Sequence, residues 1–105
     1  MDFQYKINLD GIDCHLFVSK HSLSRMVQRY ISLESLFDLV EDAGEALLSL
    51  PSSNMNQPLA LYCKRKKFTA AILLETQRHE IHVIVKTVFK GRTKYDKSRQ
   101  KEIKI

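Results

Sequence analysis

The chain has 105 residues, of which 44% are hydrophobic and 28% are charged, and its formal net charge is +5. This length predicts one domain with one modest core. No apolar stretch approaches the ~20 residues of a membrane span, and the segment MDFQYKINLDG lacks the basic and apolar regions of a secretory signal. We therefore expect a cytoplasmic protein without a membrane partner.

The first residues predict a β-hairpin followed by a helix. Residues 3–9, FQYKINL, alternate apolar and polar side chains as a half-buried strand does, and residues 12–18 predict the returning strand. Asp10-Gly11 between them is a typical two-residue turn. Residues 19–22 can supply a helix cap, and we expect the first helix to run to about Tyr30.

A second, acidic helix is expected next. Ser32 is a favourable N-cap, with Glu34 in the first turn. Apolar residues at helical spacing give this helix a face for the core, formed by Leu33, Leu36, Phe37, Val40 and Leu47. Gly44 either ends the helix or only weakens it. Residues 51–58, PSSNMNQP, predict a loop.

The second half predicts three short strands separated by charged turns. These strands are LALYCK after Pro58, FTAAILLE from Phe68 and IHVIVKTVF from Ile81. The predicted fold is α+β, with two N-terminal strands, two helices and a three-stranded antiparallel meander in two layers. Residues 1–91 would form the single domain. Residues 92–105 would form a basic C-terminal tail that is either disordered or pinned to a partner.

Charge is distributed unevenly along the chain. Residues 1–75 carry eight basic and nine acidic side chains, whereas residues 76–105 carry nine basic and three acidic ones. Residues 31–50 hold five acids and no base. A basic end is what a nucleic-acid partner requires, but a solvated tail has the same composition, so charge leaves both interpretations open.

The segment HSLSRMVQR carries the clearest functional signal. Arg25 and Arg29 lie four and eight residues after His21, so the three side chains share one helical face. The other side is apolar and is expected to enter the core; it comprises Leu23, Met26, Val27 and Tyr30. An imidazole beside two guanidinium groups suits a phosphate ligand. The arginines have a competing role, because they can instead pair with the acidic second helix.

The same segment resembles small bacterial and phage proteins of the BrnT type and a related family of uncharacterised domains. In them, a T-x-H-A-x-x-R-M-x-x-R-x-I-S segment opens the helical part, and a V-V-T-V-Y strand closes the sheet. The resemblance runs from Phe17 to Phe89. The matching residues are Ser19 at the threonine position, His21, Arg25, Met26, Arg29, Ile31, Ser32 and the strand threonine Thr87. Tyr30 stands where the family usually has glycine.

These domains are similar to the RelE, barnase and colicin group of small ribonuclease folds. The resemblance implies a metal-independent ribonuclease toxin that cleaves RNA by attack of the ribose 2′-hydroxyl on the adjacent phosphate. His21 would transfer a proton, Arg25 and Arg29 would bind the phosphate, and Thr87 would donate a hydrogen bond to it. Such a toxin requires an acidic antitoxin or immunity protein as its partner.

Other cations are expected to contact the RNA backbone; they are Lys64, Arg65, Lys66, Lys67, Lys86, Lys90 and Arg92. Residues 64–67 are equally typical of an exposed hairpin turn. Strand alternation places Lys86 on one face with His82, Ile84 and Val88, and Thr87 on the other with Ile81, Val83 and Val85. Lys86 and Thr87 would then enter one cleft only if a bulge intervenes.

The remaining histidines, His15, His79 and His82, are expected to face solvent from strands. None is convincingly placed opposite His21, so a general acid–base pair stays incomplete. Two other functions are therefore open. One is a non-catalytic binding module on the same fold, such as an immunity or antitoxin protein or a phage-encoded inhibitor. The other is an interaction module that uses the acidic helix, including Glu41 and Asp42.

We expect no cofactor and no metal, because the chain has no CxxC or HExxH spacing. Cys14 and Cys63 lie inside predicted strands. Two buried thiols in a reducing compartment are favoured over a disulfide.

Overall fold

The computed structural model describes residues 2–50, 56–91 and 101–104. Six strands form one mixed sheet in the order β1-β2-β5-β4-β3-β6. The strands are β1 (Asp2–Leu9), β2 (Ile12–Ser19), β3 (Leu59–Cys63), β4 (Phe68–Gln77), β5 (Glu80–Lys90) and β6 (Lys101–Lys104). The helices are α1 (Lys20–Gln28), α2 (Leu33–Asp42) and α3 (Gly44–Leu48). The predicted α+β class is confirmed.

The detailed arrangement differs from the predicted one at three points. β2 pairs with β5 in parallel, which joins the N-terminal hairpin to the antiparallel strands β3, β4 and β5 in one sheet. A parallel pair requires a long crossover, and the whole stretch from α1 to β4 supplies it. Residues 101–104 of the expected tail form β6, parallel to β3, and a third helix follows α2. The rest of that tail lies outside the described residues.

Gly44 is the first residue of α3, directly after the Ala43 cap of α2, and it lies against the N-terminal hairpin. A Cβ atom at this position would be 3.0 Å from the Cα atom of Leu9 and 3.1 Å from the backbone nitrogen of Asp10. A side chain at this position would crowd the hairpin backbone, so glycine lets α3 approach the β1–β2 turn this closely. The turn itself is the predicted one, with φ of 50° at Asp10 and 88° at Gly11.

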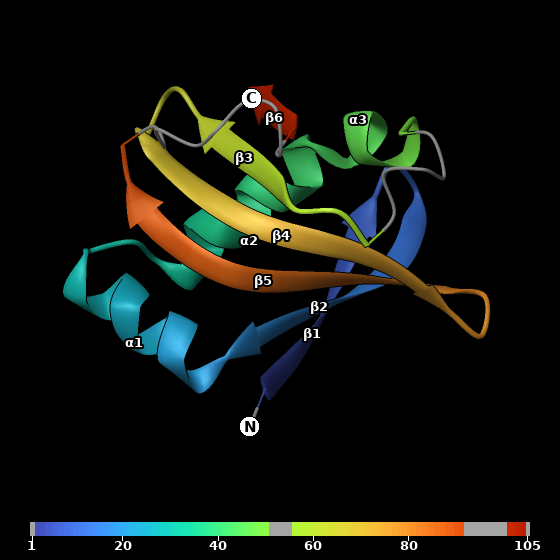
Figure 1. Cartoon of the computed structure of the whole chain (residues 1–105), viewed down its shortest axis with the longest axis horizontal. Helices are drawn as coiled ribbons and strands as arrows, with labels where there is room; N and C mark the ends of the chain where they lie inside the picture. Colours follow the sequence, from blue (N-terminus) through green and yellow to red (C-terminus); the bar gives the residue numbers. More distant parts are fainter. Residues whose placement is uncertain (1, 51–55, 92–100, 105) are drawn as a thin grey trace.

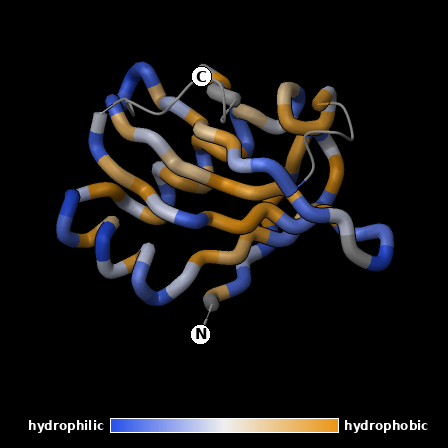
Figure 2. Tube along the Cα trace, in the orientation of Figure 1, coloured by the Kyte–Doolittle hydropathy of each residue, from blue (hydrophilic) through white to orange (hydrophobic). Residues whose placement is uncertain are grey.

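The hydrophobic core lies between the helices and one face of the sheet. Figure 1 shows α2 behind the sheet, and no helix of the described residues crosses the face that is turned to the viewer. The largest buried side chains come from both layers and include Phe68, Leu16, Leu61, Leu36 and Met26. Figure 2 shows the hydrophobic residues running along the strands, while the β4–β5 turn is hydrophilic. The described helices therefore cover one face of the sheet; we call the other the open face, on which Ala60, Thr69 and Ala71 are nevertheless buried.

The cap at the end of α1 places Tyr30 in a left-handed backbone conformation. The backbone N–H of Ile31 donates to the carbonyl of Met26 at 2.9 Å, and that of Tyr30 donates to the carbonyl of Val27 at 3.2 Å. These two bonds form a Schellman cap, whose central residue adopts the left-handed conformation. Tyr30 occupies that position with φ of 56°. Glycine would adopt this backbone conformation without strain.

Candidate functional site

The motif helix lies along an edge of β5. β2 pairs with β5 only as far as Val18 opposite Val85, and it then continues into α1. Beyond Val85, no strand of the described residues pairs with β5 on that side, and α1 takes the place of one. The hydroxyl of Ser22 donates to the carbonyl of Lys86 at 3.3 Å, and Nη1 of Arg29 donates to the carbonyl of Val88 at 2.6 Å. Side chains of α1 thus satisfy backbone acceptors that a strand would otherwise pair.

This docking changes which face of α1 is buried. Ser22 and Met26 are buried and Leu23 is half-buried, whereas Val27 is 76% exposed and Tyr30 is 90% exposed. The expectation that Val27 and Tyr30 enter the core was therefore wrong. A helix that packs against the edge of a strand buries only a narrow strip of its surface. It also faces the unpaired backbone carbonyls of that edge, which is why the polar side chains of Ser22 and Arg29 occupy the contact.

The two arginines of the motif have different surroundings. Arg29 is half-buried and is held by the Val88 carbonyl, whereas Arg25 and His21 are exposed. Within the described residues, no ion pair joins either arginine to an acid of α2. Glu41 of α2 accepts a hydrogen bond from the backbone N–H of Asn8 at 3.0 Å instead, which caps the edge strand β1. Arg29 thus makes a structural contact, and the exposed His21 and Arg25 are the motif residues better placed to meet a ligand.

A β-bulge lies beside α1. In the β4–β5 pairing, Ala71 is opposite Thr87 but Ile72 is opposite Val85, so Lys86 is an extra residue. After it, Val88 returns to the buried face with Val83 and Val85. The predicted alternation of Thr87 with Val85, and of Lys86 with Val88, was therefore wrong. Thr87 shares the open sheet face with Ala71, and Lys86 is exposed at the same point.

The predicted RNA-contacting cations gather at the same end of the sheet. The β3–β4 turn, residues 64–67, is exposed, and its Lys67 carbonyl accepts from the backbone N–H of Gly91 at 2.7 Å. Nζ of Lys90 lies 5.6 Å from the ring centroid of Tyr30. We call α1 with residues 64–67 and 86–90 the basic end, at the left of Figure 1. Arg92 lies outside the described residues.

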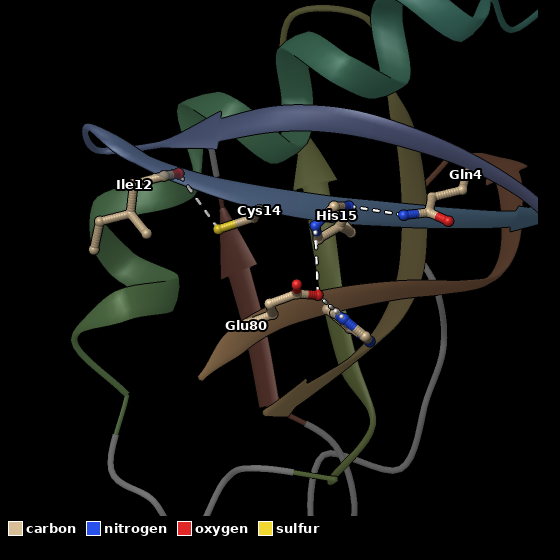
Figure 3. A network of polar contacts seen from close by, with 6 residues as sticks. Gln4, Ile12, Cys14, His15 and Glu80 are labelled. Carbon is tan, nitrogen blue, oxygen red and sulfur yellow. Dashed lines mark hydrogen bonds and ion pairs between the residues drawn. The ribbon is translucent and has the colours of Figure 1, made fainter. Parts of the chain in front are cut away.

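A second group of polar side chains lies at the other end of the β2–β5 pair, on the open face (Figure 3). Nε2 of His15 and Nε2 of His82 both face Oε2 of Glu80, at 3.5 and 3.1 Å. The two imidazole rings are edge to face, with centroids 5.6 Å apart. Nε2 of the Gln4 amide donates to Nδ1 of His15 at 2.8 Å. We call Gln4, His15, Glu80 and His82 the histidine cluster.

The histidine cluster differs from what the sequence predicted. His15 and His82 were expected to face solvent, yet their side chains are only 22% and 14% exposed. His79 was expected in a strand and instead lies exposed in the β4–β5 turn, with φ of 68°. The hydrogen bond with His82 lowers the pKa of the Glu80 carboxyl, and the charges of His15, His82 and Arg78 act in the same direction. Sequence reasoning missed the cluster because it did not predict the parallel β2–β5 register that pairs His15 with His82.

The cysteines and the apolar pocket offer fewer groups that could bind a ligand or take part in a reaction. Both cysteines are free, and burial raises the pKa of the Cys14 thiol, which donates to the Ile12 carbonyl at 3.4 Å. Cys14 is buried but Cys63 is only half-buried. An apolar pocket of about 130 Å³ lies between α3 and the sheet, lined mainly by leucines such as Leu9, Leu47 and Leu74. The described residues contain no group of three or more His, Cys, Asp and Glu side chains suited to a metal ion.

Comparison of the chain with protein-family models, curated proteins and solved structures finds no match. In the part of the chain that the structure describes, no helix has the length and apolar character that crossing a membrane requires. The two polar regions at the ends of β5 are therefore the candidate sites among the described residues.

Proposed function

We propose that this protein is a cytoplasmic, metal-independent endoribonuclease of the toxin type, which binds RNA at its basic end. One observation carries the proposal. α1 is fixed on β5 through Ser22 and Arg29, so His21 and Arg25 lie on the helix that borders the bulge at Lys86 and Thr87. The Lys64–Lys67 turn is joined to the same strand end through Gly91. An exposed imidazole on the same helix as an exposed arginine, beside a strand end that carries further cations, suits phosphodiester chemistry.

The reaction we propose is transesterification within the RNA chain. The ribose 2′-hydroxyl loses its proton, its oxygen forms a bond to the adjacent phosphorus, and the bond from phosphorus to the 5′-oxygen breaks as that oxygen gains a proton. His21 transfers one of these protons. Arg25, Lys86 and the Thr87 hydroxyl stabilise the charge on the pentacoordinate phosphate. Arg29 positions α1 through the Val88 carbonyl and is not required to contact RNA.

The proposal is tested by incubating the purified protein with total RNA in the presence of a chelator. Wild-type protein should cleave the RNA, and His21→Ala should lower the rate by about 10²–10⁴-fold, the usual contribution of one proton-transfer group. Gln28→Ala is the matched control, since Gln28 is exposed on the same helix and carries no charge. Equal cleavage by wild type and His21→Ala would remove His21 from the mechanism.

A binding module without catalysis is the second candidate, and one observation favours it. His21 is the only imidazole of the described residues at the basic end; His82 lies four residues from Lys86 along β5, or about 13 Å at 3.3 Å per residue. A general acid–base pair would therefore need a second group other than histidine. RNA binding that weakens steeply with salt, with no cleavage by the wild-type protein, would establish this alternative.

The proposed partner is an acidic protein of the antitoxin or immunity type. The basic end offers exposed cations, together with the exposed apolar side chains of Val27 on α1 and of Tyr30 just after the helix. A partner that covers this surface would compete with RNA for the same charges. Co-expression with the product of a neighbouring acidic reading frame should relieve growth inhibition and protect RNA, and Arg25→Glu should weaken the complex.

A further inference from the structure

Two histidine Nε2 atoms of the histidine cluster lie near one carboxylate oxygen of Glu80, at 3.1 Å for His82 and 3.5 Å for His15. The Gln4 amide nitrogen can only donate, so Nδ1 of His15 accepts and Nε2 of the neutral ring carries the hydrogen. Nε2 of His82 meets the same carboxylate oxygen of Glu80 and donates to it in turn. One N–H donor, from His82 on β5, therefore bonds to this oxygen, and Nε2 of His15 on the adjacent strand β2 lies 3.5 Å from the same atom. A phosphate oxygen at the same position could accept from His82 and, with a small movement, from His15.

The group that occupies this position is held by side chains alone. Glu80 is the first residue of β5, directly after the β4–β5 turn, and its side chain is 55% exposed. Its carboxylate forms no hydrogen bond to the backbone of the described residues. An exposed glutamate can change rotamer into solvent without disturbing the strand. The Glu80 carboxylate can therefore move away from the two histidines and leave room for another anionic oxygen.

Charged residues and an aromatic ring lie around the histidine cluster. Lys6 of β1 is opposite His15 in register, and Arg78 acts on Glu80 from the β4–β5 turn. Glu75 of β4 is opposite His82 and is the nearest competing acid in register. The ring of Phe17 lies 4.9 Å from that of His82 on the open face. A sugar or base attached to a phosphate would find an apolar contact there.

We infer that the histidine cluster is a phosphate-binding site, in which the Glu80 carboxylate holds the anion position until a phosphate group displaces it. Phosphate binds through Nε2 of His15 and Nε2 of His82. The ligand class is a phosphate group, carried either by a free nucleotide or by a nucleic-acid strand. This site lies about 13 Å along β5 from Lys86 and does not depend on RNA cleavage at the basic end.

The test follows the side-chain nitrogens of the histidines by NMR while inorganic phosphate is added. The signals of His15 and His82 should move together, whereas that of His79 should not. Glu80→Gln removes the competing charge at contact distance and should tighten phosphate binding roughly tenfold. His82→Phe keeps the ring against Phe17 but removes the donor, and it should abolish binding. His79→Phe is the matched control and should bind as wild type does.

Two results would overturn the inference. One is the absence of any His15 or His82 response in folded Glu80→Gln protein at the phosphate concentrations of an ordinary buffer. The other is equal loss of binding in His79→Phe and His82→Phe. The source of the phosphate is resolved by comparing a nucleoside monophosphate with a dinucleoside monophosphate. Tighter binding of the first assigns a free nucleotide and tighter binding of the second assigns an RNA strand, and both results support the site.

Discussion

The two ends of β5 use their polar side chains differently. At the basic end, Ser22 and Arg29 bond to backbone carbonyls that lack a neighbouring strand, so part of the motif holds the fold together. In the histidine cluster, the described hydrogen bonds and ion pairs join side chains to one another. A residue that satisfies buried backbone is needed by the fold whatever the protein binds. Residues that contact only other side chains, or solvent, are better candidates for a ligand.

Arg29→Ala should have the largest effect on stability. It removes a charged donor from the Val88 carbonyl, and a hydrogen bond with a charged partner contributes about 1.5–3 kcal/mol. The matched variant Arg25→Ala removes the same charge from an exposed position and should change the free energy of unfolding by less than about 0.5 kcal/mol. Urea unfolding of both variants measures the difference. Equal destabilisation would show that the two arginines share one role.

Ser22→Ala should lower the stability less, because it removes a neutral donor. The buried hydroxyl bonds to the Lys86 carbonyl, and leaving that acceptor unpaired costs about 1–2 kcal/mol. Ser24→Ala, at an exposed position of the same helix, is the control and should be close to neutral. Thermal unfolding of the pair is the measurement. A neutral Ser22→Ala would mean that α1 is not held through this carbonyl.

Tyr30→Gly should stabilise the protein. The residue has φ of 56° at the centre of the Schellman cap, where glycine relieves the backbone strain of an ordinary side chain. The gain should be about 0.5–1 kcal/mol, because added freedom of the unfolded chain and loss of the Lys90 contact offset part of the relief. Tyr30→Ala, which keeps a Cβ, should show no such gain. A destabilised Tyr30→Gly would mean that the tyrosine ring itself holds the helix end.

The smallest expected effect concerns the acid side of the pH–stability curve. The folded pKa of Glu80 is lowered, chiefly by its hydrogen bond with His82, so the folded state favours the charged carboxylate. Its contribution is complete above the ordinary glutamate pKa of about 4.3 and is lost as the pH falls through the lowered folded pKa. Glu80→Gln should therefore flatten stability in that window. If Glu80→Gln and wild type lose stability equally as the pH falls, the histidine cluster does not stabilise the Glu80 carboxylate.

Much of the fold could be predicted from local patterns. The Asp10-Gly11 turn, the Ser32 cap and the β3–β4 turn all have short-range signals, and each is found in the structure. The parallel β2–β5 pairing could not be predicted, because it joins residues that are about 67 positions apart in the chain. Neither strand carries a local sequence pattern that identifies the other as its partner. The bulge at Lys86 could not be predicted either, because the alternation of apolar and polar residues in β5 does not indicate where an extra residue lies.

The candidate site was predictable to a similar degree. The spacing of His21 and Arg25 placed them on one helix face, and both are exposed there. The role of Arg29 could not be anticipated, because it depends on where β2 ends relative to β5. The histidine cluster depends on the same long-range register. Side-chain identity therefore suggested the chemistry, while tertiary pairing determined which residues are free to take part.

The most direct test of the account is the salt dependence of RNA affinity in Arg25→Ala and Gln28→Ala, measured on folded protein. If the basic end binds RNA through its exposed cations, Arg25→Ala should weaken binding, and the slope of log affinity against log salt should become shallower by about 0.7, as for one lost phosphate contact on a single strand. Gln28→Ala should match wild type in both. Unchanged affinity and slope in Arg25→Ala would contradict the assignment of the basic end as the RNA site.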